Sequence, residues 1–238
     1  REVGAERFTR LDRALLRKTN KGFLVVSAMP PEERQIHASH MGRLRKLEEL
    51  GHAKERQTGV WEINTDLETK LRSLGNRGDI IKTMHRALRE AGIDRSGGSY
   101  SVFDSTKPNN RIVGRVAGIG LTDEINDRHY LIVDGIDGKV HYADVGHLQP
   151  EFVPEKGMIV ALVNKAGTED ERLRTRLRIL SYFSLEKLME AEGATWLDKE
   201  LLSRSPERLV QTGFGAETNA AVARRRQWLV SQRFGIVD

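Results

Sequence analysis

The sequence predicts an α+β protein with more than one small domain, and three observations lead to this expectation. Its 238 residues exceed the length of one average domain. Apolar residues recur at helical spacing near both ends of the chain, whereas they alternate with a period of two in the middle. Hydrophobic residues make up 38% and charged residues 31%, which is typical of a globular protein with charged helices.

Residues 1–93 are expected to form a winged-helix-like domain with extra helices. Apolar residues at helical spacing predict a first helix from Glu6 to Arg17, ended by Gly22. A second, longer helix starts after Pro30-Pro31 and stops at Gly51. Its expected buried stripe is Ile36, Leu44, Leu47 and Leu50, and basic residues occupy much of the remaining surface.

A hairpin follows the long helix, with strands at residues 53–56 and 60–63 around a Gln57-Thr58-Gly59 turn. Helix, long basic helix, then hairpin is the element order of a winged helix. Two further helices are expected, one over residues 65–74 and one that Asp79 caps and Gly92 closes.

Residues 98–167 are expected to form a small antiparallel β-barrel, which follows a Gly- and Ser-rich linker at residues 94–100. Alternating apolar runs at residues 111–118, 128–135, 139–145 and 158–163 indicate the strands, and Gly135-Ile-Asp-Gly138 makes a tight hairpin. Four or five short strands in this length fit an SH3-like or an OB-like barrel, and the sequence leaves both open.

Residues 168–238 are expected to be a helical C-terminal segment, with a degenerate second winged helix as one arrangement. In that arrangement Trp196 and Trp228 are core residues, and in the alternative they are exposed stacking platforms. Basic residues alternate with others over residues 172–178, so a strand there would carry its arginines on one face.

The net charge of +5 favours a polyanionic partner. Lys and Arg number 20 against 14 acidic residues in residues 1–97, 7 against 9 in residues 98–167, and 12 against 11 in residues 168–238. The excess therefore lies in the first segment, where the long helix would enter a major groove and the hairpin would lie beside it. A merely solvated charged face, or a winged helix that binds protein, is the alternative interpretation. The side chains expected to contact DNA are Arg34, His37, His40, Arg43, Arg45 and Lys46 on the helix, Lys54, Arg56 and Gln57 on the hairpin, and Arg224, Arg225 and Arg226 near the C-terminus.

No catalytic or metal-binding set is recognisable, so the sequence predicts neither an enzyme nor a cofactor. The chain has no Cys, which excludes disulfides and thiolate chemistry. His37 and His40 have no third ligand nearby in sequence, and Asp134 and Asp137 flank a turn that Asp favours. No apolar stretch reaches the roughly 20 residues that span a bilayer, so we expect a cytoplasmic protein without membrane insertion. A start without Met suggests an internal piece of a longer polypeptide, and removal of a tag is the alternative explanation.

Several segments also carry a family resemblance that extends over most of the chain. They are Gly42-Arg-Leu-Arg-Lys-Leu-Glu-Glu-Leu-Gly51 with Trp61, Leu71-Arg-Ser-Leu-Gly-Asn-Arg-Gly-Asp-Ile-Ile-Lys-Thr-Met-His-Arg-Ala-Leu88, Ile112-Val-Gly-Arg-Val116, Asp127-Arg-His-Tyr-Leu-Ile-Val-Asp-Gly135, Gly193-Ala-Thr-Trp-Leu-Asp-Lys-Glu-Leu201 and Gly213-Phe-Gly-Ala-Glu217. Together they resemble an uncharacterised C-terminal domain appended to conjugative relaxases, the mobilisation nucleases of proteobacterial plasmids and integrative conjugative elements.

The resemblance implies position and partners and transfers no catalytic residue to this chain. In such proteins the nicking Tyr and its His cluster belong to an N-terminal relaxase domain, which is expected outside this chain. The implied function is a non-catalytic auxiliary region that helps the relaxase engage transfer-origin DNA as duplex, hairpin or single strand. The alternative is a protein-recruitment or translocation-signal module that docks the relaxase to relaxosome accessory proteins or to the coupling protein of a type IV secretion channel. Such a region is cytoplasmic or travels with the relaxase during conjugation.

Overall fold

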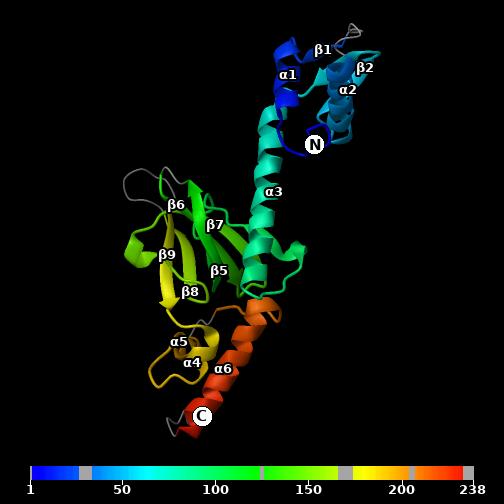
Figure 1. Ribbon diagram of the computed structural model, residues 1–238. Coiled ribbons are helices and arrows are strands. Elements are labelled where there is room, and N and C mark those ends of the chain that lie inside the picture. The colour runs from blue at the N-terminus through cyan, green and yellow to red at the C-terminus, as the bar shows by residue number, and fades with distance from the viewer. Residues whose placement is uncertain (1, 27–33, 124–125, 166–173, 204–206, 233–238) are drawn as a thin grey trace. The chain divides into compact units, whose positions relative to one another are not determined.

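The computed structural model describes residues 2–26, 34–123, 126–165, 174–203 and 207–232 of an α+β chain (Figure 1). The chain divides into two compact units, residues 1–80 and 81–238, and the boundary falls inside the helix α3. In the described part, no helix combines the length and apolarity needed to cross a membrane.

The first unit contains a three-stranded antiparallel sheet with the strand order β1-β3-β2, against which its helices pack. The predicted hairpin is confirmed, and along β3 the side chains of Trp61 and Ile63 are buried while those of Val60 and Glu62 are partly exposed. Leu15, Leu44, Leu47 and Trp61 are among the buried residues of the core that joins the helices to this sheet. The elements are α1 (Arg10–Lys18), β1 (Phe23–Val25), α2 (Arg34–Glu49), β2 (Ala53–Gln57), β3 (Val60–Ile63) and the first part of α3 (Leu67–Glu90).

Two predictions for this region were wrong. Ile36, expected in the buried stripe of the long helix, is 54% exposed. The two helices expected on either side of residues 75–78 form one continuous helix, α3, because glycine costs a helix only about 1 kcal/mol and tertiary contacts outweigh that cost. Gly75 allows such a contact, since a Cβ there would lie 2.9 Å from the Cβ of Arg7. The predicted start of the long helix at Pro30-Pro31 lies outside the described residues.

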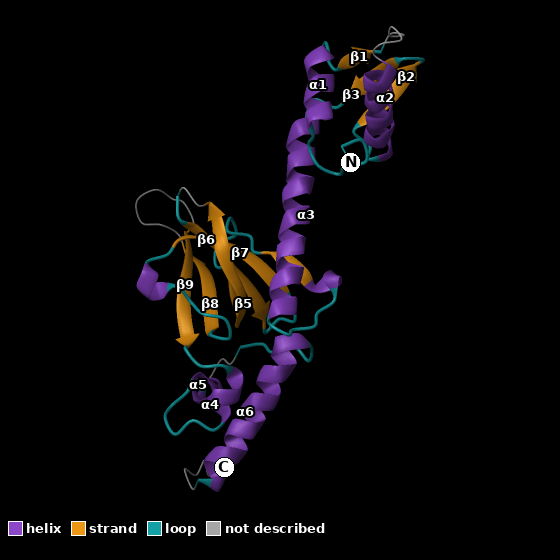
Figure 2. Cartoon of the chain, in the orientation of Figure 1, coloured by secondary structure: helices purple, strands orange, loops and turns teal. Residues whose placement is uncertain are grey.

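The second unit is organised by a six-stranded sheet with the order β4-β7-β6-β5-β8-β9 (Figure 2). Its strands are β4 (Tyr100–Val102), β5 (Arg111–Asp123), β6 (Arg128–Gly135), β7 (Val140–His147), β8 (Ile159–Lys165) and β9 (Arg174–Ser181), with short 3-10 helices at Gly97–Ser99 and Pro150–Phe152. The strands predicted from the alternating runs are present, and β6 and β7 pair around the predicted Gly135–Gly138 hairpin.

The predicted barrel is not confirmed, because the sheet does not close in the described residues. β4 and β9 end the strand order, and β4 pairs with β7 in parallel rather than antiparallel fashion. β9 extends the sheet through antiparallel pairing with β8. The prediction that residues 168–238 form a helical segment was therefore wrong for the residues of β9. A buried cluster that includes Val116, Leu131 and Leu162 fills one side of the sheet. On the other side α3 approaches so closely that a Cβ at Gly118 would lie 2.7 Å from the Cβ of Ala87.

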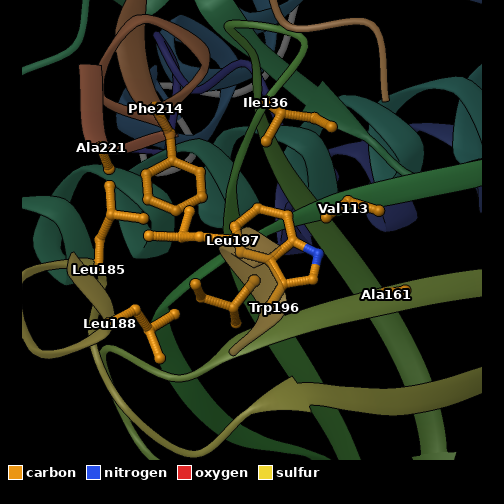
Figure 3. Packing of buried hydrophobic residues seen from close by; sticks show 10 residues of the cluster. Val113, Ile136, Ala161, Leu185, Leu188, Trp196, Leu197, Phe214 and Ala221 are labelled. Atoms are coloured by element: carbon orange, nitrogen blue, oxygen red, sulfur yellow. The ribbon is translucent and has the colours of Figure 1, made fainter. Parts of the chain in front are cut away.

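Three helices, α4 (Leu185–Met189), α5 (Trp196–Leu202) and α6 (Gly213–Ser231), complete the second unit (Figure 3). They share a second core with the sheet, to which β5 contributes Val113 and β8 contributes Ile159 and Ala161. Phe214, Trp196 and Leu197 meet Ile136 from the turn between β6 and β7 there. Gly215 permits this approach, since a Cβ at that position would lie 2.3 Å from the carbonyl oxygen of Ile136. Trp196 is therefore a core residue and not an exposed stacking platform.

Candidate nucleic-acid interface

The structure exposes only part of the basic set predicted on α2 and the hairpin. The side chains of Arg45, Lys54 and Gln57 are exposed, and none of them has an ion pair or side-chain hydrogen bond among the described residues. Lys46 bonds Glu49 at 3.0 Å, and Arg56 bonds Glu62 at 2.6 Å. His37 is partly exposed, and Arg34 begins α2 with a side chain that lies outside the described set.

Arg43 does not fit its predicted role, because its side chain is fully buried. Its guanidinium donates to both carboxylate oxygens of Asp12, at 2.7 and 2.9 Å, and to the backbone carbonyls of Val3, Ala5 and Arg7. Asp12 also accepts hydrogen bonds from the backbone N–H and hydroxyl of Thr9, the N-cap of α1. The arginine therefore fixes the start of α1 and has no surface to offer a nucleic acid.

His40 is also buried, and the pKa of its imidazole lies below the ordinary value. Burial is the main cause, and the nearby positive charges of Lys18 and His37 act in the same direction. His40 is therefore a poor cation for a phosphate contact.

Arg225 repeats the arrangement of Arg43 in the second unit. Its guanidinium donates to both carboxylate oxygens of Asp198, at 2.8 and 3.0 Å, and to the carbonyls of Ala191 and Gly193. The residue is 1% exposed, whereas Arg224 and Arg226 on either side are exposed. The predicted Arg224-Arg225-Arg226 patch is thus two surface cations around one structural residue.

The two arginine sites correspond atom by atom. Each N-cap threonine, Thr9 or Thr195, precedes a helix whose third residue, Asp12 or Asp198, completes a capping box. In both sites the Nη1 atom bonds the carbonyl four residues before that threonine, and the Nη2 atom bonds the carbonyl two residues before it. The signal in the sequence is a Thr-x-Leu-Asp-x-x-Leu-Leu pattern that starts at Thr9 and again at Thr195.

A basic surface that was missing from the predicted site runs along α1 and into the turn that follows it. Its side chains are exposed and have no ion pair among the described residues, and they are Arg10, Arg13, Arg17, Lys18 and Lys21. Arg10 and Arg13 join Arg7 and Arg72 in lining an open cavity of about 390 Å³. Helical spacing of the apolar residues places the arginines of this amphipathic helix on its solvent side. That spacing does not distinguish cations that form ion pairs from those that do not.

The charges on the hairpin are more nearly balanced than those on α1. Glu48, Glu49, Glu55 and Glu62 accompany the cations of α2 and the hairpin. On α1 itself the one carboxylate is Asp12, which is buried and bound to Arg43. The stronger positive potential is therefore expected along α1, with Arg45 and Lys54 as isolated additions.

The described residues contain no cluster of three or more His, Asp or Glu side chains that could hold a metal ion. His141 and Asp137 form a pair, with Nε2 at 3.0 and 3.1 Å from the two carboxylate oxygens. Desolvation raises the pKa of Asp137, and the bond to His141 together with nearby positive charge outweighs it, so the pKa lies below its ordinary value.

The fold and this surface define an α+β protein with an exposed basic helix. The chain belongs to the family described as "Protein of unknown function (DUF3363)", whose model matches residues 40–175 and 164–237. No curated protein and no solved structure matches the chain.

Proposed function

We propose that this chain is a non-catalytic, DNA-binding auxiliary region of a conjugative relaxase that helps the relaxase engage transfer-origin DNA. The relaxase context rests on the sequence resemblance over residues 42–217. The DNA-binding part rests on one structural observation, the row of exposed cations along α1 that have no ion pair among the described residues. Arg45 and Lys54 are further exposed cations of the same unit. Unpaired cations attract phosphates without first breaking an ion pair, so they favour a polyanion.

A winged-helix interpretation of the first unit supports this proposal. The order α1-β1-α2-β2-β3 and the antiparallel sheet β1-β3-β2 fit such a module, with α2 as its recognition helix and β2-β3 as its wing. Arg45 on α2 and Lys54 on the wing would then contact the duplex, while Arg43 holds the module together.

The proposal is tested by fluorescence anisotropy of labelled duplex and hairpin DNA over a salt series from about 50 to 200 mM. Reversing the charges of Arg10, Arg13 and Arg17 is expected to weaken binding and to flatten the plot of log K against log salt by about 0.9 per lost phosphate contact. The control reverses Arg86 and Arg89, which are exposed on α3 in the second unit. An unchanged affinity and slope in the α1 variant would remove the proposal.

A protein-recruitment role has a structural feature of its own in its favour. An apolar groove of about 310 Å³ lies between α5 and α6, and Leu201, Leu202 and Leu229 contribute to it. Leu202 is 75% exposed, which is unusual for a leucine beside such a groove. A Leu202→Glu variant that loses a purified coupling protein or relaxosome accessory protein, while its DNA affinity stays unchanged, would favour this second function.

A further inference from the structure

The gap in the open sheet of the second unit contains a groove whose chemistry differs from that of the α1 surface. β4 covers only the first three residues of β7, and beyond them β7 faces the edge strand β9. A cavity of about 550 Å³ opens between β7, the 3-10 helix Pro150–Phe152 and β9. This volume lies within the roughly 300–1,000 Å³ that is typical of ligand pockets.

The floor of the groove is apolar, and its rim is aromatic. Val145, Leu177 and Ile179 form the floor, where the core beneath the sheet reaches the surface. Phe152 and Tyr182 contribute rings to the rim from its two sides, and these residues are 57% and 63% exposed. Exposed aromatic rings that adjoin an apolar floor form a contiguous apolar patch, and such patches mark interaction sites.

The charge of the groove is positive. Arg176 and Arg178 lie on β9 with exposed side chains, and neither has an ion pair among the described residues. They alternate with Leu177 and Ile179 along the strand, so their side chains extend from the opposite face of β9, beside the groove and not from its floor. His147 lies at the end of β7, and none of the described residues that line the groove is acidic. Aromatic rings beside exposed arginines are the combination that binds single-stranded nucleic acids, because bases stack on the rings while phosphates bind the cations.

We propose that the groove between β7 and β9 is a binding site for single-stranded nucleic acid, formed by Phe152, Tyr182, Arg176 and Arg178. The groove is separate from the surface on α1. The proposal for the groove is therefore tested independently of duplex binding by the first unit. A single strand suits the site because its unpaired bases can stack on the rings, whereas paired bases within a duplex are stacked on each other.

The spacing of the strands argues against an extended peptide as the ligand. A peptide strand inserted between β7 and β9 would need them roughly 9.6 Å apart, twice the usual strand spacing. Some Cα atoms of β7 and β9 already lie within 8 Å of each other. An acidic peptide could also bind, through the arginines alone. The experiment must therefore distinguish binding of such a peptide from binding of a single-stranded nucleic acid.

The test measures binding of a labelled 12-nucleotide oligothymidine by anisotropy. Phe152→Ala and Tyr182→Ala are each expected to raise the Kd about tenfold. The Arg176→Glu/Arg178→Glu variant is expected to weaken binding and to flatten the salt slope by about 0.7 per lost phosphate contact. Phe183→Ala is the matched aromatic control, because Phe183 is equally exposed beside Tyr182 but does not line the groove. Lys199→Glu is the charge control on α5.

Two results would overturn the proposal. One is an oligothymidine affinity that stays unchanged when both rings are removed. The other is a poly-glutamate peptide that competes as well as the oligonucleotide and responds to the arginines but not to the rings. Photocrosslinking of a 5-iodouracil oligonucleotide, followed by mass spectrometry, is expected to label the peptide that contains Tyr182. Charge reversal on α1 should weaken duplex binding and leave the effect of the two ring substitutions on oligothymidine binding unchanged, so the failure of either proposal is seen separately.

Discussion

Arg43 donates two parallel hydrogen bonds to the carboxylate of Asp12, and both side chains are fully buried. The carbonyls of Val3, Ala5 and Arg7 accept the remaining hydrogen bonds that the structure assigns to this guanidinium. A buried pair of this kind contributes little net stability against apolar residues of the same volume, but removing one partner leaves an uncompensated charge. The pair therefore sets where the chain before α1 docks on α2.

Replacing Arg43 with alanine is expected to destabilise the first unit by about 3–5 kcal/mol, because Asp12 would remain buried and charged. Urea unfolding followed by circular dichroism measures the effect. Arg45→Ala, two residues further along the same helix and exposed, is the control, and it should change the free energy of unfolding by less than about 0.5 kcal/mol. Equal unfolding midpoints for the two variants would contradict the structural role of Arg43.

The second arginine site leads to a prediction for neighbouring residues of identical chemistry. Arg225→Lys should lower the thermal stability of the second unit, because a lysine cannot donate the bidentate pair to Asp198 and also reach the carbonyls of Ala191 and Gly193. Arg224→Lys should have almost no effect, since that side chain is exposed. Tryptophan fluorescence provides the readout, because the Arg225 guanidinium lies 4.6 Å from the centre of the Trp228 ring. Similar melting curves for both lysine variants would show that the second unit does not depend on the bidentate hydrogen bonds between Arg225 and Asp198.

Local patterns in the sequence predicted most of the elements. Alternation over residues 60–63 puts Trp61 and Ile63 on one face of β3, and the structure shows that this face is the buried one. Glycines marked the turn between β6 and β7. The open sheet was harder to predict, because the parallel pairing of β4 with β7 joins segments about forty residues apart and carries no local signature.

The predicted site failed where burial overrode residue type. Arg43 lies four residues before Leu47 and three after His40, so helical periodicity puts it on the buried stripe of α2 despite its charge. Arg225 likewise follows Thr218 and Ala221 along the buried stripe of α6. The carboxylates that compensate these buried charges come from other helices, 31 and 27 residues away in the sequence. The periodicity of a single helix cannot predict such a distant partner.

Two glycines in α3 offer a matched test of the continuous helix. Gly78→Ala is expected to stabilise the protein by about 1 kcal/mol, because nothing lies within 4 Å of the added methyl group and alanine is the better helix former. Gly75→Ala should lose that gain, since its Cβ would lie 2.9 Å from the Cβ of Arg7. Guanidinium chloride unfolding of both variants measures the difference. A stabilising effect of Gly75→Ala would mean that the backbone around Arg7 moves away from the added methyl group at little cost in free energy.

His40 gives the stability of the first unit a dependence on pH. Its folded pKa lies below the unfolded value of about 6.5, because of burial first and then the charges of Lys18 and His37. The unfolded chain therefore binds more protons between these two pKa values, and the free energy of unfolding falls as the pH is lowered through that window. Histidine NMR titration should place the pKa of His40 below 6.5. His40→Gln should flatten the pH dependence of urea unfolding, whereas His85→Gln, at an exposed position on α3, should leave it as in the wild type. A His40→Gln variant with the wild-type pH profile would show that other groups control the stability in this range.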